Sequence, residues 1–126
     1  MIIGVGTDIL QIERMRKALL RTPKLADRVL TPSELELCTS TTDPALFLAK
    51  RFAAKEAIAK ALGTGIGRGV SWQHMEISKD SYGRPLVELY LGAAARAEEL
   101  SIDSLQLSYS DEKEYVVAFV IAESNV

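Results

Sequence analysis

Three side chains used in many protein sites are scarce in this sequence, which has one cysteine, one histidine and one tryptophan in 126 residues. Cys38 has no second thiol to pair with, so an intrachain disulfide is excluded. A site built from several cysteines and histidines is excluded for the same reason. A chain without disulfides suits a reducing compartment, and we therefore predict a cytoplasmic protein.

Long apolar runs are also missing. The chain reaches Asp8 before the apolar region of a signal peptide could be completed, and the apolar run 115–122 is far shorter than the roughly 20 residues that a membrane helix needs. We therefore expect no membrane partner.

The charges are nearly balanced, with a net charge of −2, but they are unevenly distributed. Residues 1–69 hold 11 basic and 7 acidic side chains, and residues 70–126 hold 4 and 10. The chain is too acidic for a general nucleic-acid binder, and we expect no nucleic-acid partner. A basic first half suits an anionic partner, although ordinary solvated surface charge explains it equally well.

The order of the expected elements predicts a single small α+β domain spanning residues 1–126. We expect a short strand at 2–7, a helix from about 8 to 20, a short helix after the capping box Thr31-Pro32-Ser33-Glu34, and a long helix from Pro44 to about Leu62. Strands are expected at 70–78, 86–91, 105–110 and 115–122, and a helix at 93–100. Apolar residues surround the long helix, which predicts that it is buried and packs with an antiparallel sheet.

The first helix carries two stripes. Ile12, Met15 and Leu19 share one face, and the basic residues Arg14, Lys17 and Arg21 repeat the same spacing on another. The second stripe, called here the basic ridge, is a candidate surface for an acidic partner.

Glu56 is the most informative residue of the long helix, because it lies among apolar neighbours. An unpaired buried carboxylate costs several kcal/mol, so Glu56 needs a cation, and Lys60 one turn later can supply it. An ordinary surface pair, worth about 0.2–0.5 kcal/mol, is the alternative. Two further cations, Arg51 and Lys55, occupy the same helix and favour an anionic ligand.

The helix runs directly into a glycine-rich segment, Gly63-Thr64-Gly65-Ile66-Gly67-Arg68-Gly69. Because it follows a helix, it is neither a dinucleotide-binding motif nor a P-loop. It could simply end the helix, or it could let the backbone approach a bulky ligand closely.

Asp8 is the second candidate carboxylate. Its position at a predicted strand-to-helix junction also fits a helix N-cap. Mg²⁺ prefers one or two protein carboxylates together with water and substrate phosphates, so Asp8 and Glu56 would suffice if the fold brings them together. His74 is expected to have a packing or surface role.

Two segments resemble the motifs of bacterial holo-acyl-carrier-protein synthases, which are small 4'-phosphopantetheinyl transferases. They are Gly4-Val5-Gly6-Thr7-Asp8-Ile9 and residues 52–66, FAAKEAIAKALGTGI. The resemblance implies transfer of 4'-phosphopantetheine from coenzyme A to a serine of acyl carrier protein, for fatty acid biosynthesis.

The resemblance also assigns roles to residues. It implies that Asp8 and Glu56 bind Mg²⁺, that Glu56 and Lys60 act in catalysis, and that the basic ridge docks the carrier protein. Coenzyme A would be bound by five residues: Arg51, Lys60, Gly63, Thr64 and Gly65. It further implies a homotrimer with sites between subunits.

One position departs from the family pattern, because Asp111 follows Ser110 where many members have a histidine. An aspartate near a phosphate is unfavourable unless it turns away, so Asp111 is not a candidate catalytic residue. A non-catalytic module that binds carrier protein or coenzyme A is the alternative function. A purely structural assembly protein is a third, but it leaves Asp8, Glu56 and Lys60 together unexplained.

Overall fold

A computed structural model of the chain describes residues 1–125. The first half contains β1 (Ile2–Gln11), α1 (Ile12–Arg21), α2 (Leu25–Val29), α3 (Pro32–Ser40) and α4 (Pro44–Ala61). The second half contains the 3₁₀ turn η1 (Trp72–His74), β2 (Met75–Lys79), β3 (Pro85–Leu89), α5 (Leu91–Glu99), β4 (Ser104–Asp111) and β5 (Tyr115–Glu123).

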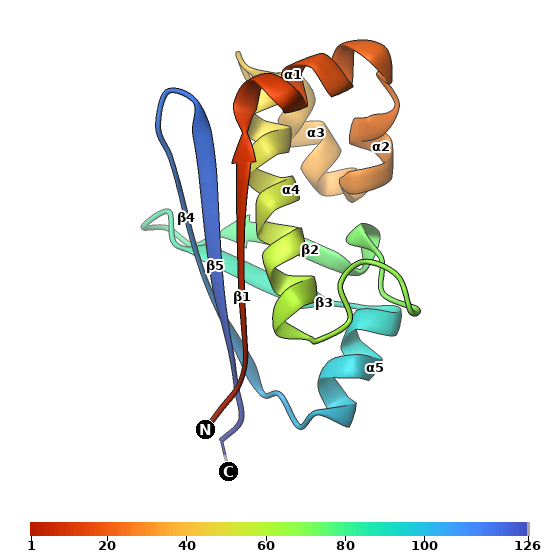
Figure 1. Cartoon of the computed structure of the whole chain (residues 1–126), viewed down its shortest axis with the longest axis vertical. Helices are drawn as coiled ribbons and strands as arrows, with labels where there is room; N and C mark the ends of the chain where they lie inside the picture. The colour runs from red at the N-terminus through yellow and green to blue at the C-terminus, as the bar shows by residue number, and fades with distance from the viewer. Residues whose placement is uncertain (126) are drawn as a thin grey trace.

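The strands form two antiparallel sheets. A three-stranded sheet has the order β1-β5-β4, and β2 and β3 form a separate hairpin. Figure 1 shows α4 lying along one face of the larger sheet, with α1, α2 and α3 gathered near its start and α5 beyond its end. The predicted α+β class, with an antiparallel sheet packed on a long buried helix, is confirmed.

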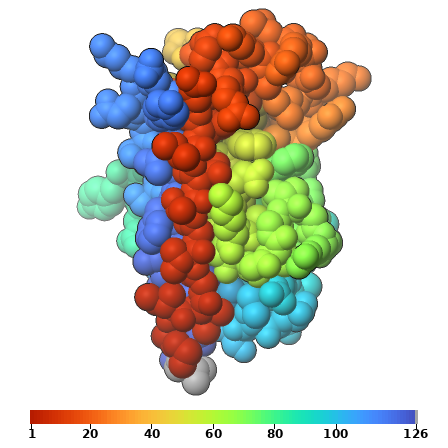
Figure 2. Space-filling view, in the orientation of Figure 1, coloured from red at the N-terminus to blue at the C-terminus, as the bar shows by residue number. Residues whose placement is uncertain are grey.

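Small residues allow α4 to lie very close to β1. Gly4 and Gly6 of β1 face the α4 backbone, and a Cβ atom added at either position would overlap a carbonyl oxygen, of Ala61 and Ala57 respectively. The helix contributes buried alanines to the same contact. This close packing brings the side chain of Lys60 to Asp8, and in Figure 2 β1 and α4 lie side by side at the surface.

The junction between the first strand and helix differs from the prediction. β1 continues to Gln11, because β5 supplies an antiparallel partner along its length and pairs Asp8 with Ala118. Asp8 therefore lies within a strand, and its interpretation as a helix N-cap is wrong, since Gln11 occupies that position. The apolar stripe of α1 is confirmed, with Ile12 and Met15 buried.

A second difference lies between the glycine-rich segment and the hairpin. Residues 72–74 form η1 rather than a strand, because Ser71 and His74 cap each other: the Ser71 N–H donates to Nδ1 of His74 at 3.2 Å. His74 therefore caps this turn. The short helix α2 was not predicted.

The capping box at the start of α3 is confirmed, with the Thr31 N–H donating to Oε1 of Glu34 at 2.9 Å. Within residues 1–125, no helix combines the length and the apolar character needed to cross a bilayer.

Candidate functional site

The structure brings together three residues proposed from sequence: Asp8 on β1, and Glu56 and Lys60 one turn apart on α4. Nζ of Lys60 lies 3.3 Å from Oδ1 of Asp8 and donates to the Thr7 carbonyl at 2.9 Å. The Lys60 side chain is 52% exposed and that of Asp8 only 18%. The cluster therefore lies at the protein surface, and Asp8 is more deeply buried than the lysine.

Glu56 lies close enough to Asp8 for the two negative charges to interact. Partial burial and then the charge of Asp8 raise the pKa of the Glu56 carboxyl, while Trp72 and Lys60 lower it. Two neighbouring carboxylates that repel each other provide a place for a cation. Lys60 forms its ion pair with Asp8, and its charge also acts on Glu56, as expected for the cation that Glu56 needs.

The carboxylates of Asp8 and Glu56 fit a hard divalent cation that takes its remaining ligands from water and from a bound phosphate compound. Residues 1–125 contain no group of three or more acidic, histidine or cysteine side chains placed to hold a metal. Two carboxylates are too few for a closed protein site, but Mg²⁺ commonly uses one or two carboxylates and completes its shell with water and substrate phosphates.

The glycine-rich segment begins by folding back onto the end of α4. The N–H groups of Gly63, Thr64 and Gly65 donate to carbonyls of Lys60 and Ala59 at 3.0 to 3.3 Å. They are thus occupied, and a phosphate would not find three free amides here. Gly65 has a φ of 64°, and nothing lies within 4 Å of an added Cβ. The loop therefore presents an open surface to a ligand.

Lys55 does not belong to the ligand site, and its interpretation as a ligand-binding cation is wrong. Its fully buried ammonium donates to Oε1 of Glu34 at 2.6 Å and to the carbonyls of Val29 and Trp72 at 2.7 and 3.1 Å. Burial is the main effect on Lys55 and lowers its pKa, whereas Glu34 opposes that shift. The buried pair joins α3, α4 and η1 behind the site.

Arg51 lies on a different face of α4 from Glu56, because five helical residues rotate by about 140°. Its guanidinium donates to the Tyr109 hydroxyl at 3.0 Å and lies 3.6 Å from Oε2 of Glu34. Its side chain is 5% exposed. Within one chain, Arg51 is therefore directed away from the cluster of Asp8, Glu56 and Lys60.

A small basic cavity of about 280 Å³ adjoins Arg51, and Lys50 and Lys79 also line it. Nearby, Asp111 pairs with Lys50 at 3.1 Å. Asp111 is thus held by a cation. Lys50 and Lys79 were not among the residues identified from sequence.

The basic ridge of α1 is present at the surface, since Arg14, Lys17 and Arg21 are all exposed. Arg16, on another face of the helix, instead pairs with Asp43 at 3.1 Å. Beside α1 lies a cavity of about 570 Å³ whose lining includes Leu19 and Leu20. The first helix therefore offers both charge and apolar surface.

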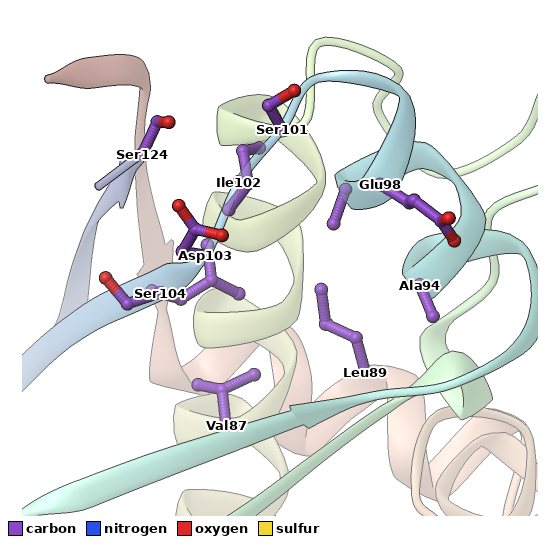
Figure 3. A pocket seen from close by; sticks show the side chains of 11 residues that line it. Val87, Leu89, Ala94, Glu98, Ser101, Ile102, Asp103, Ser104 and Ser124 are labelled. Carbon is purple, nitrogen blue, oxygen red and sulfur yellow. The ribbon is translucent and has the colours of Figure 1, made fainter. Parts of the chain in front are cut away.

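A larger cavity, of about 620 Å³, lies elsewhere, between β3, α5 and the segment leading into β4 (Figure 3). Val87, Leu89 and Ile102 supply apolar lining, and Glu98 and Asp103 supply acidic groups. None of Asp8, Glu56 and Lys60 lines it, so cavity size alone would have indicated the wrong place.

Trp72 is a residue of the site that sequence reasoning missed. Its ring lies 5.8 Å from that of Phe52, centroid to centroid, and its side chain lowers the pKa of the Glu56 carboxyl. The only sequence signal was its uniqueness as the single tryptophan, which alone indicates no role.

The fold is that of a known family. The model of the 4'-phosphopantetheinyl transferase superfamily matches residues 4–120, and the chain belongs to this superfamily. The enzyme class expected from the sequence motifs is therefore confirmed.

The chain is similar to named relatives over almost its whole length. It is 53% identical to the holo-[acyl-carrier-protein] synthase of Shewanella piezotolerans, over 98% of this chain and 100% of the relative. The crystal structure of the synthase from Neisseria meningitidis is 42% identical, with a TM-score of 0.92 and coverage of 98% and 100%. The Helicobacter pylori synthase in complex with coenzyme A is 34% identical, with a TM-score of 0.82 and coverage of 94% and 99%.

Proposed function

We propose that this chain is a holo-acyl-carrier-protein synthase, which transfers 4'-phosphopantetheine from coenzyme A to a serine of apo acyl carrier protein and releases 3',5'-ADP. The observation that carries the proposal is the juxtaposition of Asp8, Glu56 and Lys60, contributed by β1 and α4. The near full-length similarity to synthases, one of them bound to coenzyme A, supports the substrate assignment. In this proposal residues 1–126 form one transferase domain.

Transfer of a phosphoryl-type group depends mainly on positioning and charge neutralisation. Asp8 and Glu56 would hold Mg²⁺, which when bound supplies positive charge against the pyrophosphate of coenzyme A. Lys60, exposed and anchored on Thr7, places a second positive charge beside it. The carrier serine forms a bond to the β-phosphorus as the bond to 3',5'-ADP breaks. The serine proton passes to the carboxylate of Glu56.

The remaining coenzyme A contacts come from the start of the glycine-rich segment. Gly63, Thr64 and Gly65 follow Lys60 directly, so a ligand held by that lysine lies next to their open surface. Arg51 cannot reach the same ligand from within one chain. We place Arg51 and its basic cavity against coenzyme A bound mainly by a neighbouring copy.

The outer face of the larger sheet supports an assembly of copies, and we propose a homotrimer with sites between subunits. Five apolar side chains are exposed on β1 and β5, where a monomer would place polar residues: Val5, Ile9, Tyr115, Val117 and Phe119. The register sets Ile9 opposite Val117. Contiguous exposed apolar surface of this kind marks interaction sites. Replacing Phe119 by lysine should yield monomers with little transferase activity, and a fully active monomer would refute shared sites.

The basic ridge of Arg14, Lys17 and Arg21 is the proposed docking surface for the acyl carrier protein, and the biological role is carrier activation for fatty acid biosynthesis in the cytoplasm. Exposed basic side chains that are free to reorient suit an acidic protein partner.

A mass measurement tests the function directly. Incubating the chain with coenzyme A, Mg²⁺ and apo acyl carrier protein should increase the carrier mass by roughly 340 Da, the phosphopantetheine group added by this transfer. A carrier that is bound but unchanged in mass would instead support the non-catalytic binding module. The presence of aspartate rather than histidine at position 111 favours that alternative.

A further inference from the structure

The indole of Trp72 is held in place on the side facing α4. Its ring lies 5.8 Å from that of Phe52, which is one helical turn before Glu56 and on the same face of α4. The Trp72 carbonyl accepts from the buried Lys55 ammonium at 3.1 Å, and Lys55 immediately precedes Glu56. The tryptophan is therefore fixed to α4 by its backbone and by its ring.

Two side-chain polar atoms of residues 1–125 are buried without a hydrogen-bond partner, and Nε1 of Trp72 is one of them. A buried donor without a partner costs about 1–3 kcal/mol, so buried donors nearly always have a hydrogen-bond acceptor. Trp72 lowers the pKa of the Glu56 carboxyl, and Phe52, on which the indole packs, precedes Glu56 by one helical turn, so the Glu56 carboxylate is the acceptor within reach of this donor.

We propose that Trp72 is a positioning residue, whose indole N–H donates to one oxygen of Glu56 and leaves the other oxygen free for the divalent cation. The ring packing on Phe52 fixes the direction of the donor, and the buried Glu34–Lys55 pair fixes the backbone that carries it. The part of the inference that concerns the cation rests on the proposed function. The contact between Trp72 and Glu56 does not.

The contact can be measured without metal or substrate, because a single tryptophan yields a single indole N–H signal in a proton–nitrogen correlation spectrum. Glu56→Ala removes the acceptor, and should move this signal upfield and speed its exchange with solvent. The control is Glu36→Ala, at an exposed position on α3, which should leave the signal in place. An indole signal unaffected by Glu56→Ala would overturn the proposal.

The effect on the cation is tested with Trp72→Phe, which keeps an aromatic ring beside Phe52 but has no N–H. Loss of a hydrogen bond to a charged group should weaken Mn²⁺ binding, measured by electron paramagnetic resonance of the free ion, by roughly tenfold. The KM for carrier protein should stay unchanged. Tyr82→Phe, at a position that is 96% exposed, is the matched control and should bind Mn²⁺ as the unmodified chain does.

The outcomes separate this inference from the proposed function. Normal turnover by Glu56→Gln would refute the catalytic role of Glu56 while leaving the indole measurement valid. Unchanged Mn²⁺ affinity in a folded Trp72→Phe protein, together with loss of turnover in Glu56→Gln, would overturn the positioning role alone. Thermal unfolding of each variant confirms that it is folded before these comparisons are made.

Discussion

The ammonium of Lys60 lies 3.3 Å from Oδ1 of Asp8, and the two residues are 52 positions apart in the chain. The lysine also donates to the Thr7 carbonyl, so it connects the end of α4 to the middle of β1. The pair is partly exposed, and such pairs contribute at most about 1 kcal/mol to stability. Its importance is positional, because it sets a cation directly beside the two carboxylates.

The approach of β1 to α4 depends on Gly6. Replacing it by alanine would drive a Cβ into the Ala57 carbonyl, so the strand must move away from the helix. We expect Gly6→Ala to lower the free energy of unfolding by about 3 kcal/mol and to abolish turnover.

The matched control is Gly83→Ala in the β2–β3 turn, where an added Cβ has open space but the φ of 84° is unfavourable for alanine. It should cost about 1–2 kcal/mol and leave turnover intact. Denaturant unfolding and the carrier mass assay measure both effects, and full activity in Gly6→Ala would disprove the role assigned to the close contact.

The buried pair of Lys55 and Glu34 supports the site from behind. Lys55→Met leaves the fully buried Glu34 carboxylate without its main cation, which should destabilise the protein by about 3–5 kcal/mol. Adding Glu34→Gln removes the stranded charge and should restore part of that loss. Urea unfolding of the single and double variants measures the difference. A double variant less stable than Lys55→Met alone would show that the carboxylate is not the source of the penalty.

Glu56 predicts an unusual pH dependence of the metal-free protein. Burial and the charge of Asp8 raise the pKa of the Glu56 carboxyl in the folded state above its value in the unfolded state. Between these two pKa values the folded state binds more protons than the unfolded state, so the free energy of unfolding falls as the pH rises. Glu56→Gln should therefore raise the melting temperature in EDTA at neutral pH, and the gain should vanish in acid below the unfolded pKa. A variant that is less stable than the parent at neutral pH would contradict this sign.

The basic ridge predicts a salt-dependent interaction with the carrier. Arg14→Glu should raise the carrier KM several-fold with little change in kcat, and increasing salt should weaken the parent enzyme's carrier binding because surface charges are screened over about 8–10 Å. Arg84→Glu, in the exposed β2–β3 turn, is the matched control. Equal carrier kinetics for both variants would place the docking surface elsewhere.

Local signals predicted the elements that the structure confirms. The capping box before α3, the proline at the start of α4 and the apolar stripe of α1 depend on neighbouring residues alone. The end of β1 does not, because its last residues become a strand only by pairing with β5, more than 100 positions away. Local periodicity therefore placed the helix too early and made Asp8 resemble a cap.

The candidate site shows the same limit. Spacing on a helix correctly put Glu56 and Lys60 on one face, but it could not tell which cations of α4 serve a ligand. Lys55 is occupied by Glu34, a partner 21 positions away, and Lys60 pairs with a residue of another element. Trp72 comes near Glu56 only because the chain returns across α4 after the glycine-rich segment.

Cation binding tests the central claim most directly, namely that Asp8 and Glu56 share one divalent ion. Calorimetric titration of Mg²⁺ into the chain saturated with coenzyme A should give one ion per chain, and Asp8→Asn and Glu56→Gln should each weaken binding by at least about tenfold, since Mg²⁺ takes so few protein ligands. Binding of undiminished affinity in both variants would contradict the claim.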